Sequence, residues 1–452
     1  MKKATKAIKA KKATKGKELK ISFIQAFVAS FAFVASFAFS AGAQAVFSPI
    51  VKRLNLAESE RLAKLNNPKL LASLEDIAIA EQRVRMARHL RLPQLGFDAA
   101  AATFEAERNF VLYEEMGGTP LSPSEKERMY LGRATLEQNL YTGGKIQNAV
   151  VLAKAALEKA KSERDKISLQ VTREVRLRFL ESLVVREKKR LNEDLIKGFE
   201  IYRPRSSDAP FSYLLWQDHQ IGFEDAAAEA DLKAERETLF GLLRSIGMNL
   251  SSEVEIAGEI KDLKFPPKLP VLEEALSWAR EFRPEYRTEA LASEMSAAQV
   301  AIALASRSPV ISLAGMYEFL GPDFPLRTSN WSAMVRMHMP LSWDSWATIR
   351  ERRAQQRKGQ VERVNIDDQI GLQVRQSFLD LTNKFAAAGR RREHLKRWRE
   401  LYGQALARAA GYESKIEVFE RYAKARGSLI AAEAAALAAL YEFEFAVGRD
   451  VE

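Results

Sequence analysis

The sequence RMYLGRATLEQNLYTGGK, residues 128–145, decides the fold together with the helical stretch that follows it. Its first ten residues alternate between two faces, as the residues of a β-strand do. From residue 146 the apolar residues recur about every 3.5 positions, which is the spacing of a helix that packs along a seam. One strand face has Tyr130, Ala134 and Leu136 and the other has Arg133, Thr135 and Glu137, while the helical seam has Ile146, Ala149, Ala153, Ala156, Ala160 and Ile167.

A helix from Gly144 to about Lys197 would be on the order of 80 Å long, at roughly 1.5 Å per residue. The small alanines along its seam let a neighbouring helix approach closely. A single-layer globular core has no use for a rod of this length. The segment therefore predicts a coiled coil or a tube of helices.

The composition indicates a folded, exported chain. It has 452 residues, 47% of them hydrophobic, and it has no cysteine, which excludes disulfides, thiolate metal sites, a cysteine nucleophile and a lipidated N-terminal cysteine. The net charge is +11, but nine lysines and one glutamate within the first twenty residues supply +8 of it. The basic balance therefore indicates targeting and not nucleic-acid binding.

Residues 1–45 have the pattern of a signal peptide. The lysine-rich start is followed by an apolar run from Ile21 to Ser40 and by the small residues Ala41–Ala45. We expect cleavage after Ala43 or Ala45, so that the mature chain begins near Val46. The apolar run is also long enough to span a bilayer, so an uncleaved anchor is the alternative. Both predict export from the cytoplasm.

The rest of the chain divides into two structural repeats, residues 46–265 and 266–452, with the same order of helix, strand, strand, long helix and return helix. In both, the first helix lies between prolines 25 residues apart, Pro68 and Pro93 or Pro284 and Pro309. The first repeat is expected to have a β-hairpin at about 92–142, a long helix at about 144–197 and a return helix at about 213–247. The corresponding elements of the second are expected at about 309–342, 346–410 and 418–448.

Each hairpin has one apolar and one polar face, as a sheet exposed to lipid does. A lone hairpin cannot persist in a membrane, because its open edges leave backbone groups unpaired. Two hairpins are too few to close a barrel. We therefore expect several chains to pool their strands in an obligate oligomer.

With these features the chain resembles the TolC-type outer-membrane efflux and secretion channels, the outer membrane factors. The motifs that match are Leu92-Pro93-Gln94-Leu95 before the first strand, Leu140-Tyr141-Thr142-Gly143-Gly144-Lys145 after the second, and Pro340-Leu341-Ser342-Trp343-Asp344 as a degraded copy of the latter. The resemblance covers about residues 66–448. It implies a mainly α fold with a membrane β-barrel part, in which a trimer shares a 12-stranded barrel that continues as a periplasmic α-helical barrel.

The same resemblance implies a location and partners. The protein would lie in the lipid of the Gram-negative outer membrane as a homotrimer with a long periplasmic extension. It would serve as an exit duct that receives substrates from an inner-membrane transporter through a periplasmic adaptor, a membrane fusion protein.

The resemblance also suggests a periplasmic constriction at Glu417 and Glu420. These acids follow Gly411 by six and nine residues, in the family's acid-Val-Leu-acid position, here Glu417-Val418-Phe419-Glu420. In the family such acids face the axis, and three copies of each would form anionic rings that select cations. The alternative is that they are ordinary solvated helix charges. The first reversal, around Phe211-Ser212-Tyr213-Leu214, has no acid in the matching place.

Two further groups of residues are candidates. The helix reversals resemble the adaptor-contacting tips of the family, although they could equally be simple turns; the tip residues are Arg203, Arg205, Ser206, Gly411, Ser414 and Lys415. On the polar strand faces, residues placed to line the barrel lumen, or else to lie on the surface near loops, are Arg133, Glu137, Arg336 and His338.

No catalytic constellation is present in the sequence. The four histidines, His89, His219, His338 and His394, stand apart from one another, and there is no nucleotide-binding motif. We therefore expect no enzyme activity, no cofactor, no metal site and no nucleic-acid partner. A passive efflux duct is the favoured function. The alternatives are the outer-membrane duct of a type I protein secretion system and an exported coiled-coil scaffold without a pore.

Overall fold

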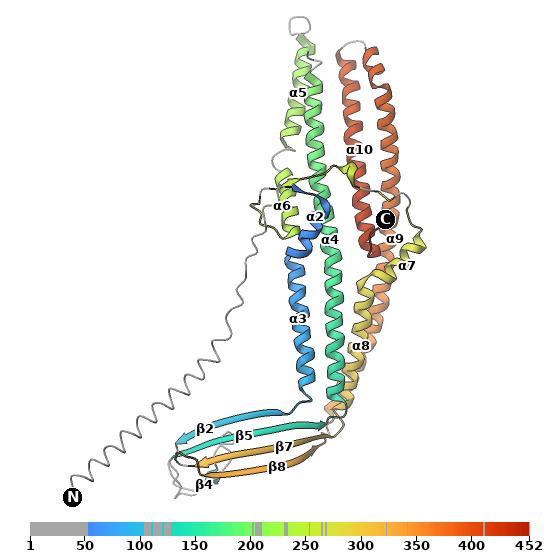
Figure 1. The fold of residues 1–452 in the computed structure, drawn as a ribbon. Coiled ribbons are helices and arrows are strands. Elements are labelled where there is room, and N and C mark those ends of the chain that lie inside the picture. Colours follow the sequence, from blue (N-terminus) through green and yellow to red (C-terminus); the bar gives the residue numbers. More distant parts are fainter. Residues whose placement is uncertain are drawn as a thin grey trace, which may run out of the picture. The chain divides into compact units, whose positions relative to one another are not determined.

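The computed structural model describes residues 53–103, 110–111, 120–121, 128–200, 203, 210–229, 234–252, 254–263, 265–266, 269–321, 323–340, 342–409 and 412–451 (Figure 1). The expected signal peptide, residues 1–45, lies outside them. The elements are, in chain order, β1 (Arg53–Leu54), α2 (Leu56–Asn66), α3 (Pro68–His89), β2 (Gln94–Thr103), β3 (Phe110–Val111), β4 (Pro120–Leu121), β5 (Arg128–Tyr141), α4 (Lys145–Glu200), α5 (Pro210–Glu229), α6 (Glu235–Ile246), β6 (Glu255–Ile256), the 3-10 helix η3 (Ile260–Asp262), α7 (Leu272–Phe282), α8 (Pro284–Ala305), β7 (Val310–Gly321), β8 (Thr328–His338), α9 (Asp344–Arg408) and α10 (Tyr412–Val447).

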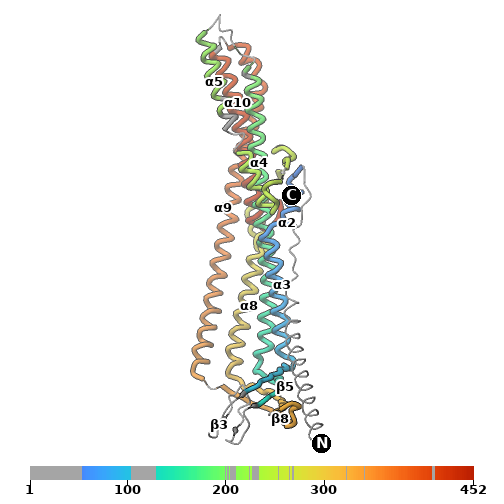
Figure 2. The backbone as a smooth tube through the Cα atoms, turned by 90° about the vertical axis from the view of Figure 1, so that its left-hand side faces the viewer, coloured from blue at the N-terminus to red at the C-terminus, as the bar shows by residue number. Residues whose placement is uncertain are grey.

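Long helices make up most of this part of the chain. α4 has 56 residues, α9 has 65 and α10 has 36. In the half of the helical region nearer the sheet, α3, α4, α8 and α9 run next to one another. In the half farther from the sheet, α4 and α9 continue beside α5 and α10 (Figures 1 and 2). None of the helices among the described residues is both long enough and apolar enough to cross a bilayer.

Four antiparallel strands form the main sheet, in the order β2-β5-β7-β8. The pairs β2–β5 and β7–β8 are the two hairpins expected from the sequence, and β5–β7 joins them. β5 leads into α4 through Thr142, whose buried side chain accepts a hydrogen bond from the Ile146 backbone. The strand-to-helix change in the sequence is therefore a direct junction in the fold.

In each repeat, a glycine at the end of the last helix packs against the backbone just before the helix that leads to the sheet. Gly247 ends α6 and Gly448 follows α10, both with φ of 81°. A Cβ at Gly247 would meet the carbonyl of Asn66, just before the proline that starts α3. A Cβ at Gly448 would lie 3.0 Å from the carbonyl carbon of Phe282, just before the proline that starts α8. Only glycine combines this backbone conformation with so close an approach.

Two helices were not expected from the sequence. α2 and α7 fall in segments for which the sequence pattern predicts no helix. Both have a short apolar face: Leu62 of α2 packs in a core with α4, α6 and α10, and Ala275 and Ala279 of α7 pack in a second core with α9 and α10. α2 and α7 thus add side chains to the two hydrophobic cores near the start of each repeat.

A half-buried arginine of α4, Arg176, connects α4 to α2 and to the residues that follow α10. Arg176 donates hydrogen bonds to Glu60 at 2.6 Å and to both Glu444 and Asp450 at 2.7 Å. Burial opposes the charge of Arg176, but its hydrogen bonds to Asp450 and Glu60 outweigh burial and raise its pKa. Burial also raises the pKa of Glu444 to about 7, although a hydrogen bond from the Val451 backbone and the charge of Arg176 oppose this.

The glycine contacts predict that alanine substitutions at two different glycines change the stability of the protein in opposite directions. Gly247→Ala should destabilise the protein by about 1–3 kcal/mol, because it forces an L side chain into the left-handed region and against the Asn66 carbonyl. Gly389→Ala, in the interior of α9 with open space around it, should stabilise by about 0.5–1 kcal/mol. Thermal unfolding of the detergent-purified protein, followed by circular dichroism, measures both. Equal effects of the two substitutions would contradict the close contact.

The arginine network makes a second prediction. Arg176→Met should cost about 3–5 kcal/mol, because it leaves Glu60 and Glu444 partly buried without their cation. Arg178→Met, in the same helix, removes an exposed pair with Glu181 and should cost less than about 1 kcal/mol. Denaturant unfolding of the two variants gives the comparison. A similar loss in both would show that the network contributes no more than an exposed pair.

Candidate functional site

The main sheet has an apolar face that is largely exposed in the described part of the chain. Its side chains alternate with polar ones along each strand, as the sequence pattern predicted. Paired positions bring Phe97, Ala134, Tyr317 and Trp331 into one row across all four strands. Phe97 is 74% exposed and Trp331 is 75% exposed. An uncovered apolar sheet of this size marks a surface made for lipid or for another chain.

The opposite face of the sheet is polar. Asp98, Arg133, Glu318 and Asn330 form a row across the four strands. Arg133 lies 3.5 Å from Glu318 in an ion pair whose side chains are 19% and 18% exposed, and the Asn330 amide donates to the second oxygen of Glu318 at 3.4 Å. The polar row is thus held by paired charges.

All four residues predicted for the lumen lie on this polar face. Arg133 and Glu137 are on β5, and Arg336 and His338 are on β8 at positions of the same register as Asn330. Arg133 is paired and half-buried, while the other three are exposed. Their common face agrees with the alternation in the sequence. Whether that face surrounds a lumen depends on how the sheet is completed.

The sheet has two open edges. β2 and β8 each pair with one neighbouring strand only within the described part of the chain. Their outer N–H and C=O groups therefore have no ladder partner there. Such edges need another strand wherever water is absent.

At the other end of the long helices, a small core joins the two helical hairpins. It holds aromatic side chains from α5 and α10 against leucines of α4; its buried members are Leu191, Leu195, Trp216, Ile416, Phe419 and Ala423. Arg203, a predicted tip residue, lies over the rings of Tyr213 and Trp216, at 5.9 and 5.1 Å from their centroids. The first reversal, which lacks an acid in the matching place, thus has a cation–π contact.

Glu417 lies on the exposed side of α10, and Glu420 lies at the edge of this core, next to α5. The Glu417 carboxylate accepts hydrogen bonds from Arg421 at 3.0 and 2.7 Å, one turn further along the helix. The Glu420 carboxylate lies 3.0 Å from Nδ1 of His219 on α5. The side chains of Glu417 and Glu420 are 62% and 42% exposed. Both acids are thus presented on the surface with a basic neighbour each.

His219 is the residue that sequence analysis missed. We had expected all four histidines to be isolated, but the fold places His219 beside Glu420. Nothing in the sequence links them, because one is in each repeat. Among the other histidines, His394 accepts a hydrogen bond from the Trp398 indole at 3.2 Å. The described part of the chain contains no group of three or more His, Asp or Glu residues arranged to hold a metal ion.

The remaining tip residues are only partly described. Ser414 is exposed and Lys415 is half-buried in the first turn of α10. Arg205, Ser206 and Gly411 lie outside the described residues.

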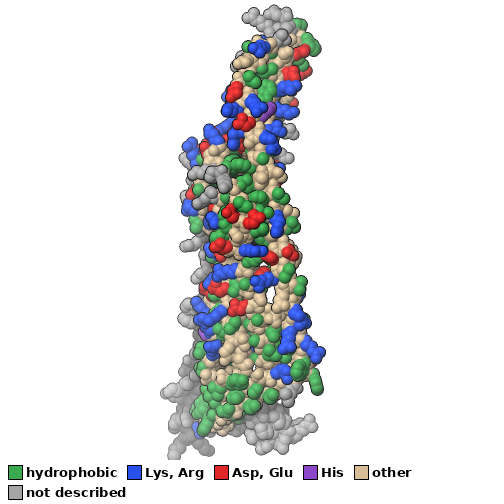
Figure 3. Space-filling model, turned by 90° about the vertical axis from the view of Figure 1, so that its right-hand side faces the viewer, with side chains coloured by type: hydrophobic (Ala, Val, Ile, Leu, Met, Phe, Trp, Pro, Cys, Tyr) green, Lys and Arg blue, Asp and Glu red, His purple; other side chains and the backbone are tan. Residues whose placement is uncertain are grey.

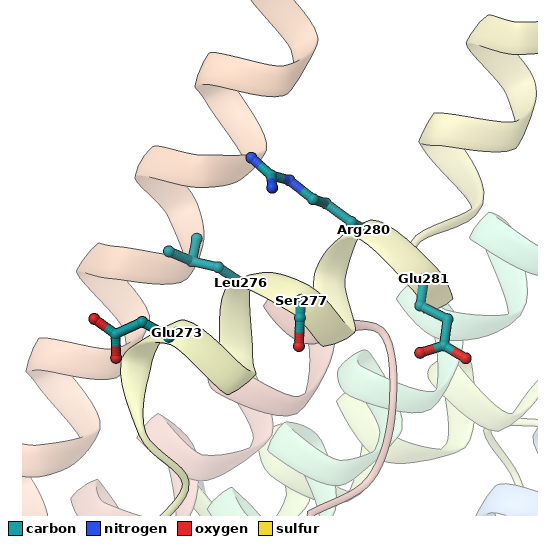
Figure 4. Close-up of a pocket in the computed structure, with 5 residues that line it drawn as sticks. All are labelled: Glu273, Leu276, Ser277, Arg280 and Glu281. Atoms are coloured by element: carbon teal, nitrogen blue, oxygen red, sulfur yellow. The ribbon is translucent and has the colours of Figure 1, made fainter.

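One surface pocket lies along α7. Its lining residues, Glu273, Leu276, Ser277, Arg280 and Glu281, all come from this helix, and Arg280 extends towards α9 (Figure 4). In the first turn of α8, the Tyr286 hydroxyl donates to Asp367 of α9 at 2.7 Å, and burial together with this bond raises the pKa of Tyr286 to about 12. A pocket lined by one exposed helix has too few converging groups to indicate a ligand.

The comparisons with known proteins agree with this geometry. Residues 61–201 match the family model described as outer membrane efflux protein. No curated protein sequence matches the chain. The fold matches the open-state structure of the MtrE outer membrane channel of Neisseria gonorrhoeae, with a TM-score of 0.71 and 16% identity over 87% of this chain and 89% of that one.

The chain has the fold of an outer membrane efflux protein. A second match is the outer membrane protein VceC of Vibrio cholerae, with a TM-score of 0.70 and 14% identity over 88% of this chain and 97% of that one. CusC, whose structures address transmembrane channel formation, has a TM-score of 0.71 and 12% identity over 87% and 92%. The resemblance to outer membrane factors that the sequence motifs suggested is thereby confirmed, and so is the mainly helical fold.

Proposed function

We propose that this efflux protein acts as a homotrimeric outer-membrane duct, in which three copies close one 12-stranded barrel. The open edges of the sheet support this, because β8 of one copy can pair with β2 of the next and leave no edge. The apolar face then meets lipid, and the polar face with Arg133, Glu137, Arg336 and His338 surrounds a lumen.

The exposed apolar side chains of the helices support the same assembly. On α3 they include Leu71 and Leu74, and on α9 they include Val361, Val364 and Leu379, all at least 45% exposed. Such side chains along a helix more than sixty residues long need a partner. Neighbouring copies that complete the sheet would place their own helices alongside and close an α-helical barrel in the periplasm.

The family match favours a role in efflux, with a periplasmic adaptor at the tips around Arg203 and Ser414 and an inner-membrane transporter as the source of energy. A type I secretion duct would use the same geometry and differ only in its cargo. A scaffold without a pore would not use four strands with an uncovered apolar face. The uncovered face of the sheet is therefore the observation on which the proposal rests.

Adjacent residues of β8 test the membrane-facing assignment. Val335→Lys places a charge in the middle of the apolar face and should reduce the yield of folded oligomer in vesicles, because a lysine there costs about 2–4 kcal/mol per chain. Met334→Lys makes the same change on the polar face and should fold like the unsubstituted protein. Heat-modified mobility on gels measures folding, and single-channel recording measures conductance. A stable protein that inserts into vesicles without conductance would instead support the scaffold.

The assignment of Glu417 and Glu420 to the constriction has its own test. Replacing both by Gln should weaken the cation preference of the channel and its block by multivalent cations, because two anionic rings are removed. Glu273→Gln with Glu281→Gln changes the net charge equally on the exposed surface of α7 and should leave both properties unchanged. Reversal potentials in a KCl gradient give the comparison. Unchanged ion selectivity in the first variant would contradict the constriction assignment and show that Glu417 and Glu420 are ordinary solvated helix charges.

A further inference from the structure

Exposed arginines gather where the helices meet the sheet. Arg88 is in the last turn of α3, and Arg91 lies between α3 and β2. Arg307 lies between α8 and β7. α9 begins after β8 and presents Arg350 and Arg353 within its first three turns. We name these five residues the basic belt. Figure 3 shows Lys and Arg side chains next to the hydrophobic band at the sheet end of the molecule.

The belt is not neutralised within the described part of the chain. None of its five arginines has an ion-pair partner there, and Arg307 instead lies 3.8 Å from the centroid of the Trp346 ring. The segments that contain these arginines, residues 81–93, 302–309 and 344–353, have three acidic residues: Glu81, Asp344 and Glu351. Some cations further along the same helices are paired: Lys69 with Glu174 and Arg392 with Glu433.

The position of the belt matches the headgroup region of a membrane. Arg91 lies three residues before β2, and Arg350 lies six residues, or about 9 Å, beyond the start of α9. The polar region of a bilayer extends roughly 5–8 Å beyond the hydrocarbon on each side, and arginine side chains reach several ångströms further. The strongly exposed Trp343 and Tyr141 lie in the same layer, where aromatic side chains favour the membrane interface.

Completion of the barrel concentrates this charge. α3 is attached to the edge strand β2, and α9 is attached to the other edge strand, β8. When β8 of one copy pairs with β2 of the next, Arg350 and Arg353 of the first come near Arg88 and Arg91 of the second. Like charges brought together beside a low-dielectric layer repel unless an anion lies between them.

We propose that the basic belt binds the phosphate groups of anionic phospholipids in the leaflet on the helix side and so stabilises the junction between copies. This inference rests on the proposed insertion of the sheet and goes beyond it, because a barrel can form in neutral lipid. The guanidinium group suits this ligand, since it donates a fork of hydrogen bonds to phosphate. Three junctions in a trimer provide three such sites.

The test compares oligomer stability in vesicles of phosphatidylcholine with and without about one quarter phosphatidylglycerol. The midpoint temperature of oligomer dissociation should rise by about 5 °C with the anionic lipid, and 0.5 M NaCl should remove most of the rise by screening. Arg350→Gln with Arg353→Gln should lose most of this rise. Arg390→Gln with Arg391→Gln, which removes two exposed cations further along α9, should keep it.

The outcomes separate this proposal from the proposed function. A conducting oligomer that is equally stable in both lipids, or an equal effect in the two double variants, overturns lipid binding by the belt and leaves the duct in place. Inorganic phosphate that reproduces the rise in neutral vesicles also overturns it, because the ligand would then be a free anion. An absence of oligomer and conductance in both lipids contradicts the duct itself.

Discussion

The backbone hydrogen bonds at the two edges of the sheet are the constraint on which the rest of the structure depends. Four antiparallel strands with one apolar face cannot stay in water without exposing that face, and cannot enter lipid without completing β2 and β8. Association of identical chains satisfies both needs at once. Because each strand of the main sheet adjoins one of the helices α3, α4, α8 and α9 in the chain, the helices of associated copies would follow the symmetry of the sheet. In the proposed trimer, a helical barrel thus follows from the barrel of strands.

The duplication explains why one chain supplies two hairpins with similar surroundings. Each return helix ends in a glycine that packs against the start of the same repeat, Gly247 against Asn66 and Gly448 against Phe282. These contacts fix where the first helix of each repeat leaves towards the sheet. The two repeats then differ at their ends. The first reversal has an arginine over aromatic rings and the second has paired acids.

The parts of the fold that could be predicted from sequence are those with local periodicity. Alternation placed the strands and their faces, and the spacing of prolines and glycines placed the starts and ends of the helices. The common face of Arg133, Glu137, Arg336 and His338 followed from strand parity alone. Contacts between distant segments could not be predicted in this way. Two such contacts are the pairing of His219 with Glu420 and the network of Arg176 with Glu60, Glu444 and Asp450. They join residues far apart in the sequence, which no local periodicity relates. α7 was missed because an eleven-residue helix beside prolines looks like a linker.

In the proposed duct, the core at the helix reversals would limit how the tip opens. Trp216 of α5 and Phe419 of α10 belong to one buried core with Leu191 and Leu195 of α4, and Glu420 meets His219 across the two hairpins. Within one chain the hairpins are therefore coupled by buried aromatic contacts, which are costly to separate. Widening at the tip would then proceed by the movement of each pair of hairpins as one unit relative to its neighbours, and charges such as Glu417 and Arg421 on the exposed side of α10 are the groups that such a movement would rearrange.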